Sequence, residues 1–179
     1  MKRFLIITAV FAISIAGIAW FGASARAQQA EIMTEAHIER IRSNCVDAQS
    51  ILFQLHASDA GLRVNRGQIY ESISTKLMTP LNSRIVLNRL DSVNLVSIAA
   101  NYENQLQEFR TLYQQYEESM SDTLDMDCTD EPVAFYDSIA ETREKRQLTH
   151  DSTVTLHKTI LEYGDEFEAF AEDFQADNS

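Results

Sequence analysis

Two cysteines, Cys45 and Cys128, are the residues whose type most restricts the chemistry of this chain. Neither lies in a Cys-x-x-Cys pair or beside a nucleophile motif, which argues against a catalytic thiol. In a chain exported from the cytoplasm, two thiols usually form one disulfide. We therefore predict a disulfide between Cys45 and Cys128, and a disulfide between two chains is the alternative.

The four histidines do not have the spacing of a metal site. His150 and His157 share a helix face but lie about 10 Å apart along it, so one metal ion cannot easily bind both. The chain contains neither His-Glu-x-x-His nor the Glu-x-x-His pair of di-iron bundles. Gly-rich phosphate loops and nucleophile elbows are also absent. We predict no catalytic residue, no metal ligand and no cofactor.

An acidic segment, Asp125-x-Asp127-x-Thr129-x-Glu131, imitates the first half of a calcium loop. Its sixth position is Asp130 where the loop needs Gly, and its twelfth is Tyr136 where the loop needs Glu. Acidic residues also favour the N-terminus of a following helix. We expect a loop that caps a helix, and a weak calcium site at residues 125–131 is the alternative.

The elements that position these residues are expected to be helices. The chain has 179 residues but only five Gly and two Pro, whereas β-sandwiches, barrels and α/β domains draw on both at frequent turns. Apolar residues also recur with helical spacing in two segments. The first seam is Ile38, Ile41, Cys45, Ala48, Leu52 and Leu55, and the second is Leu95, Ala99, Tyr102, Leu106, Phe109, Tyr113, Tyr116 and Met120. The predicted class is all-α.

The predicted architecture is an elongated antiparallel bundle of three long, coiled-coil-like helices and a short corner helix, behind an N-terminal signal or anchor helix. A disulfide joins Cα atoms less than 7 Å apart, which favours a first helix that folds back on the helix of the second seam. The expected helices cover about 30–78, a corner at 80–90 starting at Thr79-Pro80, a helix after Asp91-Ser92, and about 131–175. A break near Gly61 or Gly67, giving four shorter helices, is the alternative, since Gly costs a helix only about 1 kcal/mol.

Two further features of these helices concern charge. Asp59 and Arg66 fall in the seam of the first helix, where a buried charge must be paired; we interpret them as a buried ion pair or a partner contact. Residues 141–152 contain Leu148 as their only large aliphatic side chain, which indicates a solvated or frayed part of the last helix.

The N-terminus indicates export. Lys2 and Arg3 precede 18 uncharged residues (4–21), and Ala25-Arg26-Ala27 has the form that signal peptidase reads. The sequence fits two alternatives: a cleaved signal peptide, and a retained anchor that would attach the chain to the membrane. Residues 1–27 are therefore expected to be the signal or anchor, and residues 28–179 one extracytoplasmic domain, secreted or held at the cytoplasmic membrane.

Charge restricts the partners of this domain. The whole chain has a net charge of −12; without Lys2, Arg3 and Arg26, 12 basic and 27 acidic residues remain, a net charge of −15. Nucleic acid and anionic lipid should repel such a domain, so we predict no nucleic-acid partner and cations or basic surfaces as electrostatic partners. The function expected is a non-enzymatic envelope spacer or interaction module, with a protein partner or self-association. The alternative is a small-ligand or divalent-metal bundle that uses the acidic loop or the tyrosine-rich seam.

Overall fold

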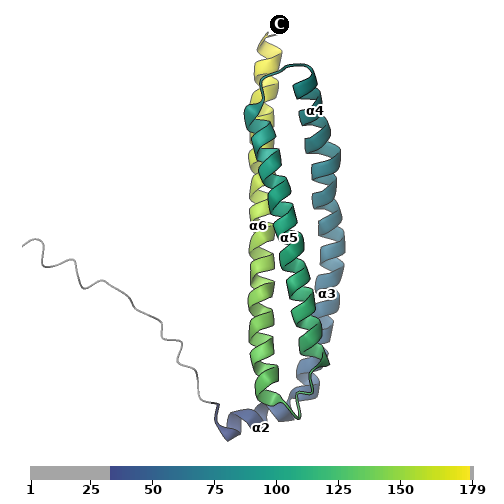
Figure 1. Cartoon of the computed structure of the whole chain (residues 1–179), viewed down its shortest axis with the longest axis vertical. Helices are drawn as coiled ribbons and strands as arrows, with labels where there is room; N and C mark the ends of the chain where they lie inside the picture. Colours follow the sequence, from purple (N-terminus) through teal and green to yellow (C-terminus); the bar gives the residue numbers. More distant parts are fainter. Residues whose placement is uncertain (1–32, 178–179) are drawn as a thin grey trace, which may run out of the picture. The chain divides into compact units, whose positions relative to one another are not determined.

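The computed structural model describes residues 33–177, and Figure 1 shows their helices. In chain order they are α2 (Glu35–Ser43), α3 (Cys45–Ser72), the π-helix η1 (Ile73–Met78), α4 (Thr79–Leu87), α5 (Val93–Asp125) and α6 (Pro132–Asp177). No strand occurs in this part of the chain, which confirms the all-α class. None of the helices within residues 33–177 is long and apolar enough to cross a membrane. The predicted signal or anchor, residues 1–27, lies outside the described residues.

The first long helix continues through both of its glycines. α3 includes Gly61 and Gly67 without interruption, so the predicted alternative of a break there is wrong. The helix is instead interrupted at Asn44, which is neither a glycine nor a proline and was therefore not predicted as a break. Asn44 leaves the helical conformation (φ −104°, ψ 10°), and its Nδ2 donates to the carbonyl oxygen of Arg40 at 2.7 Å. The amide side chain therefore satisfies a carbonyl group at the end of α2, as asparagine commonly does at helix termini.

The chain does not start a new capped helix at Thr79-Pro80, as the sequence had suggested. Thr79 is itself helical (φ −62°, ψ −48°), and its N–H donates to Ser74 O, five residues back, as in a π-helix. Pro80 follows as one of the first residues of α4. Because proline lacks an N–H and crowds the carbonyl group one turn before it, a widened π turn can accommodate it without ending the helix. Helical backbone thus runs unbroken from Cys45 to Leu87.

The corner between α4 and α5 lies at residues 88–92. Arg89 has a positive φ of 59°, and the Leu90 N–H donates to Ile85 O at 3.1 Å, which closes the end of α4. α5 begins directly after Ser92, as predicted, but the Ser92 side chain makes no capping hydrogen bond. The reversal brings α5 back alongside α3 (Figure 1).

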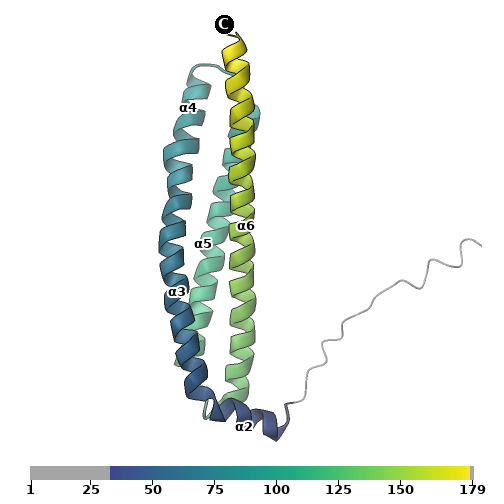
Figure 2. The ribbon, with the colours of Figure 1, turned by 180° about the vertical axis from the view of Figure 1, so that it is seen from behind.

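The core lies mainly where α5 packs along α6 (Figure 2). Its buried members from several helices are Tyr70, Met78, Ile85, Leu95, Tyr102, Leu106, Phe109, Leu156 and Tyr163. The second predicted seam supplies Leu95, Tyr102, Leu106 and Phe109, so at these positions the apolar side chains pack in the core.

The middle of α6, residues 141–152, is a regular helix whose side chains are mostly exposed, so the prediction of a solvated stretch is confirmed and the frayed alternative is wrong. One side of it is nevertheless covered. Thr142 and Ser152 are buried, and the Thr142 hydroxyl lies 2.7 Å from Ser119 Oγ and 2.9 Å from Thr123 Oγ1. Small hydroxyl side chains therefore occupy the interface with α5 in this region. A search for large apolar residues does not detect such an interface.

The predicted disulfide is present. Cys45, the first residue of α3, is bonded to Cys128 in the segment between α5 and α6, with Cα atoms 5.6 Å apart. Both cysteines are buried with Phe135, and Ile41, Ala48, Leu52, Met126 and Ile139 pack against them. Gln49 also donates to Met126 O at 3.0 Å. The disulfide thus fastens the start of α3 to the end of α5.

Candidate functional site

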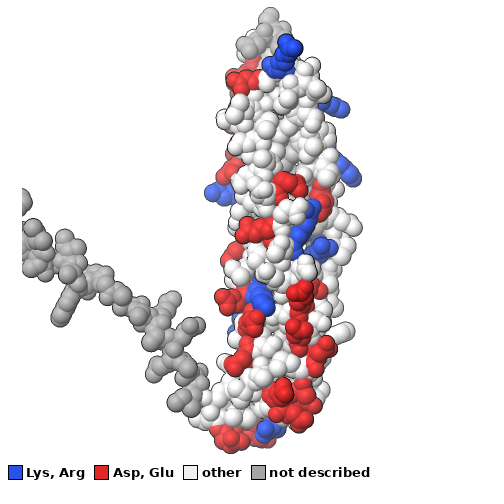
Figure 3. Space-filling model, viewed as in Figure 1, with Lys and Arg blue, Asp and Glu red and all other residues white. Residues whose placement is uncertain are grey.

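The basic side chains are distributed unevenly for a chain with a net charge of −12. On the face in Figure 3, acidic side chains gather at the end where α2 and the α5–α6 segment lie. Half-way along the helices, by contrast, α3, α5 and α6 line an open cavity of about 540 Å³ with four arginines and one carboxylate in its walls. Its polar and charged lining residues are Asp59, Arg63, Arg66, Tyr113, Tyr116, Arg143, Arg146, Gln147, Thr149, His150 and Thr153. We call it the arginine cavity.

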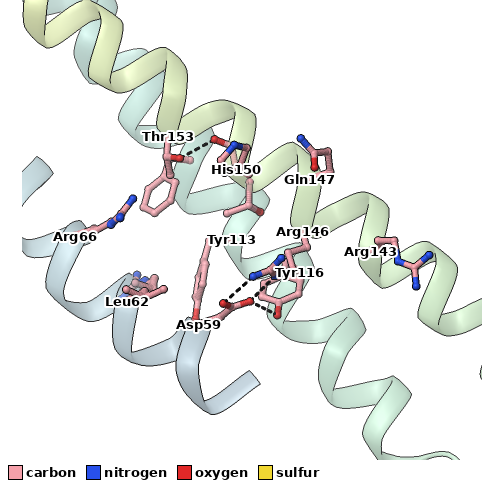
Figure 4. Close-up of a pocket in the computed structure, with 13 residues that line it drawn as sticks. Asp59, Leu62, Arg66, Tyr113, Tyr116, Arg143, Arg146, Gln147, His150 and Thr153 are labelled. Carbon is pink, nitrogen blue, oxygen red and sulfur yellow. Dashed lines mark hydrogen bonds and ion pairs between the residues drawn. The ribbon is translucent and has the colours of Figure 1, made fainter. Parts of the chain in front are cut away.

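The negative charge of Asp59 is paired within the arginine cavity. Its carboxylate oxygens accept hydrogen bonds from Arg146 Nε at 2.6 Å, from Arg146 Nη2 at 3.1 Å and from the Tyr116 hydroxyl at 2.8 Å (Figure 4). Burial alone would raise the pKa of the Asp59 carboxyl, but these hydrogen bonds and the positive charge of Arg146 outweigh it, so the pKa lies below its ordinary value. Asp59 therefore connects α3 to both α5 and α6.

Aromatic rings form the α5 wall of the arginine cavity. The Arg63 guanidinium lies over the Tyr113 ring, 5.2 Å from its centroid, and Phe109 and Tyr116 flank that ring. Burial, followed by the hydrogen bond that Tyr113 donates to Glu117, raises the pKa of Tyr113 above its ordinary value. The hydroxyl group is therefore neutral. Tyr113 is the partly accessible ring of this wall, beside the Arg63 cation, and Phe109 and Tyr116 are buried on either side of it.

Arg66 does not pair with Asp59, although both lie on α3. Arg66 is exposed, extends into the space between α3 and α6 (Figure 4), and has no ion-pair partner within residues 33–177. The partner of Asp59 is Arg146, which the sequence did not suggest. The geometry is therefore consistent with Asp59 as one member of an ion pair. Its partner, however, is not Arg66.

The Asp59 contact predicts a pH dependence of stability. Because the folded pKa of Asp59 is depressed, its contribution is complete above the pKa of the unfolded chain and is lost as the pH falls through the folded value. We expect the free energy of unfolding to fall more between pH 6 and pH 3 in the wild type than in Asp59→Asn, measured by urea denaturation. Asp151→Asn, an exposed substitution on α6, is the control and should behave like the wild type. Equal pH dependence of wild type and Asp59→Asn would contradict the assignment.

A second cavity, of about 550 Å³, lies nearer the α4 end of the helices. Its walls are mainly apolar and come from η1, α4 and α6: Ile73, Lys76, Leu77, Met78, Pro80, Leu81, Arg84, Ile160, Tyr163, Gly164 and Phe167. Tyr163 is held there by donating to Asn82 Oδ1 at 2.9 Å. The π-helix thus contributes directly to this wall.

The acidic segment forms a turn between α5 and α6, and the hydrogen bonds of its Asp127 side chain lie within that turn rather than on α6. Asp127 Oδ1 accepts from the N–H groups of Thr129 and Asp130 at 2.9 and 3.1 Å, which orders the turn before α6. Among the described residues, no group of three or more His, Cys, Asp or Glu side chains is arranged to hold a metal ion. Of the histidines, His56 lies 2.9 Å from Glu117, and His150 lines the arginine cavity.

Three arginines of the cavity were not singled out from the sequence, namely Arg63, Arg143 and Arg146, and His150 was considered only as a metal ligand. A signal was present, since Arg143, Arg146 and His150 recur at helical spacing in a stretch with few aliphatic side chains, and Arg63 precedes Arg66 by one turn. What the sequence does not show is that α5 brings the two groups together.

Comparison with known proteins identifies no relative: no protein-family model, no curated protein and no solved structure matches the chain. The site is therefore interpreted from its own residues.

Proposed function

We propose that this chain is an exported, non-enzymatic envelope protein whose helices form an elongated antiparallel bundle, residues 28–179, and that it works as an interaction module by pairing with a second copy of itself. Export through residues 1–27, by cleavage or as an anchor, is part of this proposal and is supported by their charge and apolar pattern. The observation that carries the self-association is a second heptad seam on α3, at positions outside the core.

This outer seam consists of Val46, Ser50, Phe53, Ala57, Ala60, Val64 and Gly67, spaced by alternating four and three residues. Its large members are exposed: Val46 by 76%, Phe53 by 65% and Val64 by 50%. Apolar side chains at this spacing normally pack against another helix. Within residues 33–177 none of these three side chains is buried, although Val64 lines a small cavity with Leu106 and Phe109 of α5.

The order of large and small residues favours a second copy, antiparallel to the first. If Ala57 of one copy lies opposite Ala57 of the other, Phe53 faces Ala60, Val46 faces Gly67 and Ser50 faces Val64. Every larger side chain then meets a small one, and a hypothetical Cβ at Gly67 has no atom within 4 Å in the single chain. Such alternation allows two helices to interlock, and two-fold dimers use one surface patch twice.

The test is the association state of the exported protein, with residues 1–27 cleaved or retained as the cell leaves them. It is measured by sedimentation velocity. We expect a dimer in the wild type and a monomer for Phe53→Glu, because a charge would be buried at the seam. Leu87→Glu, at an 80% exposed position outside the seam, is the control and should remain dimeric. A monomeric wild type at 100 μM would contradict the proposal.

A cross-link tests the antiparallel register separately. Ala57→Cys places two thiols on either side of the proposed two-fold axis, so mild oxidation should give a covalent dimer. Ser58→Cys, an exposed neighbour off the seam, should give little. Equal cross-linking of both variants would overturn the register.

Binding of a small ligand is a second candidate function, favoured by the arginine cavity.

A further inference from the structure

We propose that the arginine cavity binds a small organic anion: a carboxylate or similar oxyanion held by Arg66 and Arg63, with an aromatic body against Tyr113 and Leu62. This inference rests on the second candidate function, ligand binding, and is independent of the outer seam. It departs from the expectation, drawn from net charge alone, that electrostatic partners of this chain are cations or basic surfaces.

The first argument is the balance of charge around the cavity. Its walls contain Arg63, Arg66, Arg143 and Arg146 but a single carboxylate, Asp59, which Arg146 and Tyr116 already occupy. The other three arginines have no carboxylate partner within residues 33–177. In a chain with 27 acidic residues, such a grouping creates a local positive potential that attracts anions.

The second argument is the geometry of the donors. Arg66 extends from α3 into the space between the helices (Figure 4), and Arg63 is held against the Tyr113 ring. Guanidinium groups present paired N–H donors that match the two oxygens of a carboxylate. Asp59 holds Arg146 in place by two hydrogen bonds, so the α6 wall is ordered before a ligand arrives.

The third argument is the size and lining of the cavity. About 540 Å³ is within the usual range of small-ligand sites, which combine apolar walls with a few polar groups. The half-buried Tyr113 and the exposed Leu62 offer an apolar surface beside the arginines, with the buried Phe109 behind Tyr113. An inorganic anion would leave this surface unused, whereas an aromatic acid would cover it and place its charge beside Arg66.

The proposal is tested by isothermal titration calorimetry of the exported protein with three probes: 2-naphthoate, its neutral analogue 2-naphthamide, and inorganic phosphate. We expect 2-naphthoate to bind with one site per chain, and the amide and phosphate to bind at least tenfold more weakly. No binding of naphthoate at millimolar concentration would overturn the proposal. Equal affinity for the amide would overturn the role of charge, and equal affinity for phosphate would overturn the role of the aromatic wall.

Variants locate the site. Arg66→Gln should weaken naphthoate binding at least tenfold, and since Arg66 is exposed and unpaired among the described residues, the fold should persist. Arg84→Gln, which removes an arginine from the apolar cavity instead, is the matched control and should bind as the wild type does. Equal losses in both variants would show a general charge effect and reject the site. Sedimentation of the same samples reports on the outer seam, so failure of one proposal is distinguishable from failure of the other.

Discussion

Reducing the Cys45–Cys128 disulfide is expected to lower the free energy of unfolding by about 4 to 5 kcal/mol, which is the largest effect we predict. The bond joins residues separated by 83 positions, and a closed loop of that length removes much of the conformational entropy of the unfolded chain. At roughly 2 to 4 °C per kcal/mol for a domain of this size, the melting temperature should fall by about 8 to 20 °C.

The measurement is urea denaturation of the protein with and without tris(2-carboxyethyl)phosphine, alongside a Cys45→Ala/Cys128→Ala variant. Reduction leaves both side chains in place, so agreement between the two would assign the loss to the cross-link rather than to altered packing. A loss below about 1 kcal/mol would contradict the prediction.

The loss should also show local consequences at one end of the helices. Without the bond, polar contacts to the α5–α6 segment include Gln49 Nε2 of α3 to Met126 O and Arg42 Nε of α2 to Thr129 O, each at 3.0 Å. Hydrogen exchange should therefore quicken in α2 and the first turns of α3, but not where Leu106 and Leu156 are buried together in the core.

The substitution Leu156→Ala is expected to cost about 3 kcal/mol. Leu156 on α6 is fully buried against the core, and deleting a buried leucine side chain usually costs 2 to 5 kcal/mol, because both burial and packing are lost. The free energy of unfolding from urea denaturation gives the value.

Leu161→Ala is the matched control for this prediction. It makes the same chemical change five residues further along α6, at a position that is 56% exposed. We expect a change within about 0.5 kcal/mol. Similar costs at Leu156 and Leu161 would mean that α6 does not face α5 as the structure has it.

The helical class and the disulfide were predictable from the sequence, since both depend on local or pairwise properties. Scarce glycine and proline leave few places for turns, and the repeating seam around Tyr102 and Leu106 marks the face of α5 that packs. Two cysteines allow one intrachain pairing. The position of Pro132 in the first turn of α6 follows in the same way, since proline is tolerated there.

The boundaries of the helices were less predictable, because they depend on competing local interactions of similar size. Asn44 ends α2 through its own side-chain hydrogen bond, whereas Gly61 and Gly67, the nominal helix breakers, remain inside α3. Pro80 stays within the helical run because the backbone widens into a π turn before it. A difference of about 1 kcal/mol decides such cases, and tertiary packing readily supplies it.

The arginine cavity was decided by tertiary structure alone. The sequence by itself determined that Asp59 falls on an apolar seam and needs a partner, but not that Arg146, 87 residues away, supplies it. Nor does the net charge of −12 show that Arg63 and Arg66 lie across from a second basic group. Periodicity reports which side of a helix is buried, whereas the partner across the interface depends on the register between helices. That register is set here by the disulfide, the corner at residues 88–92 and the packing of α5 on α6.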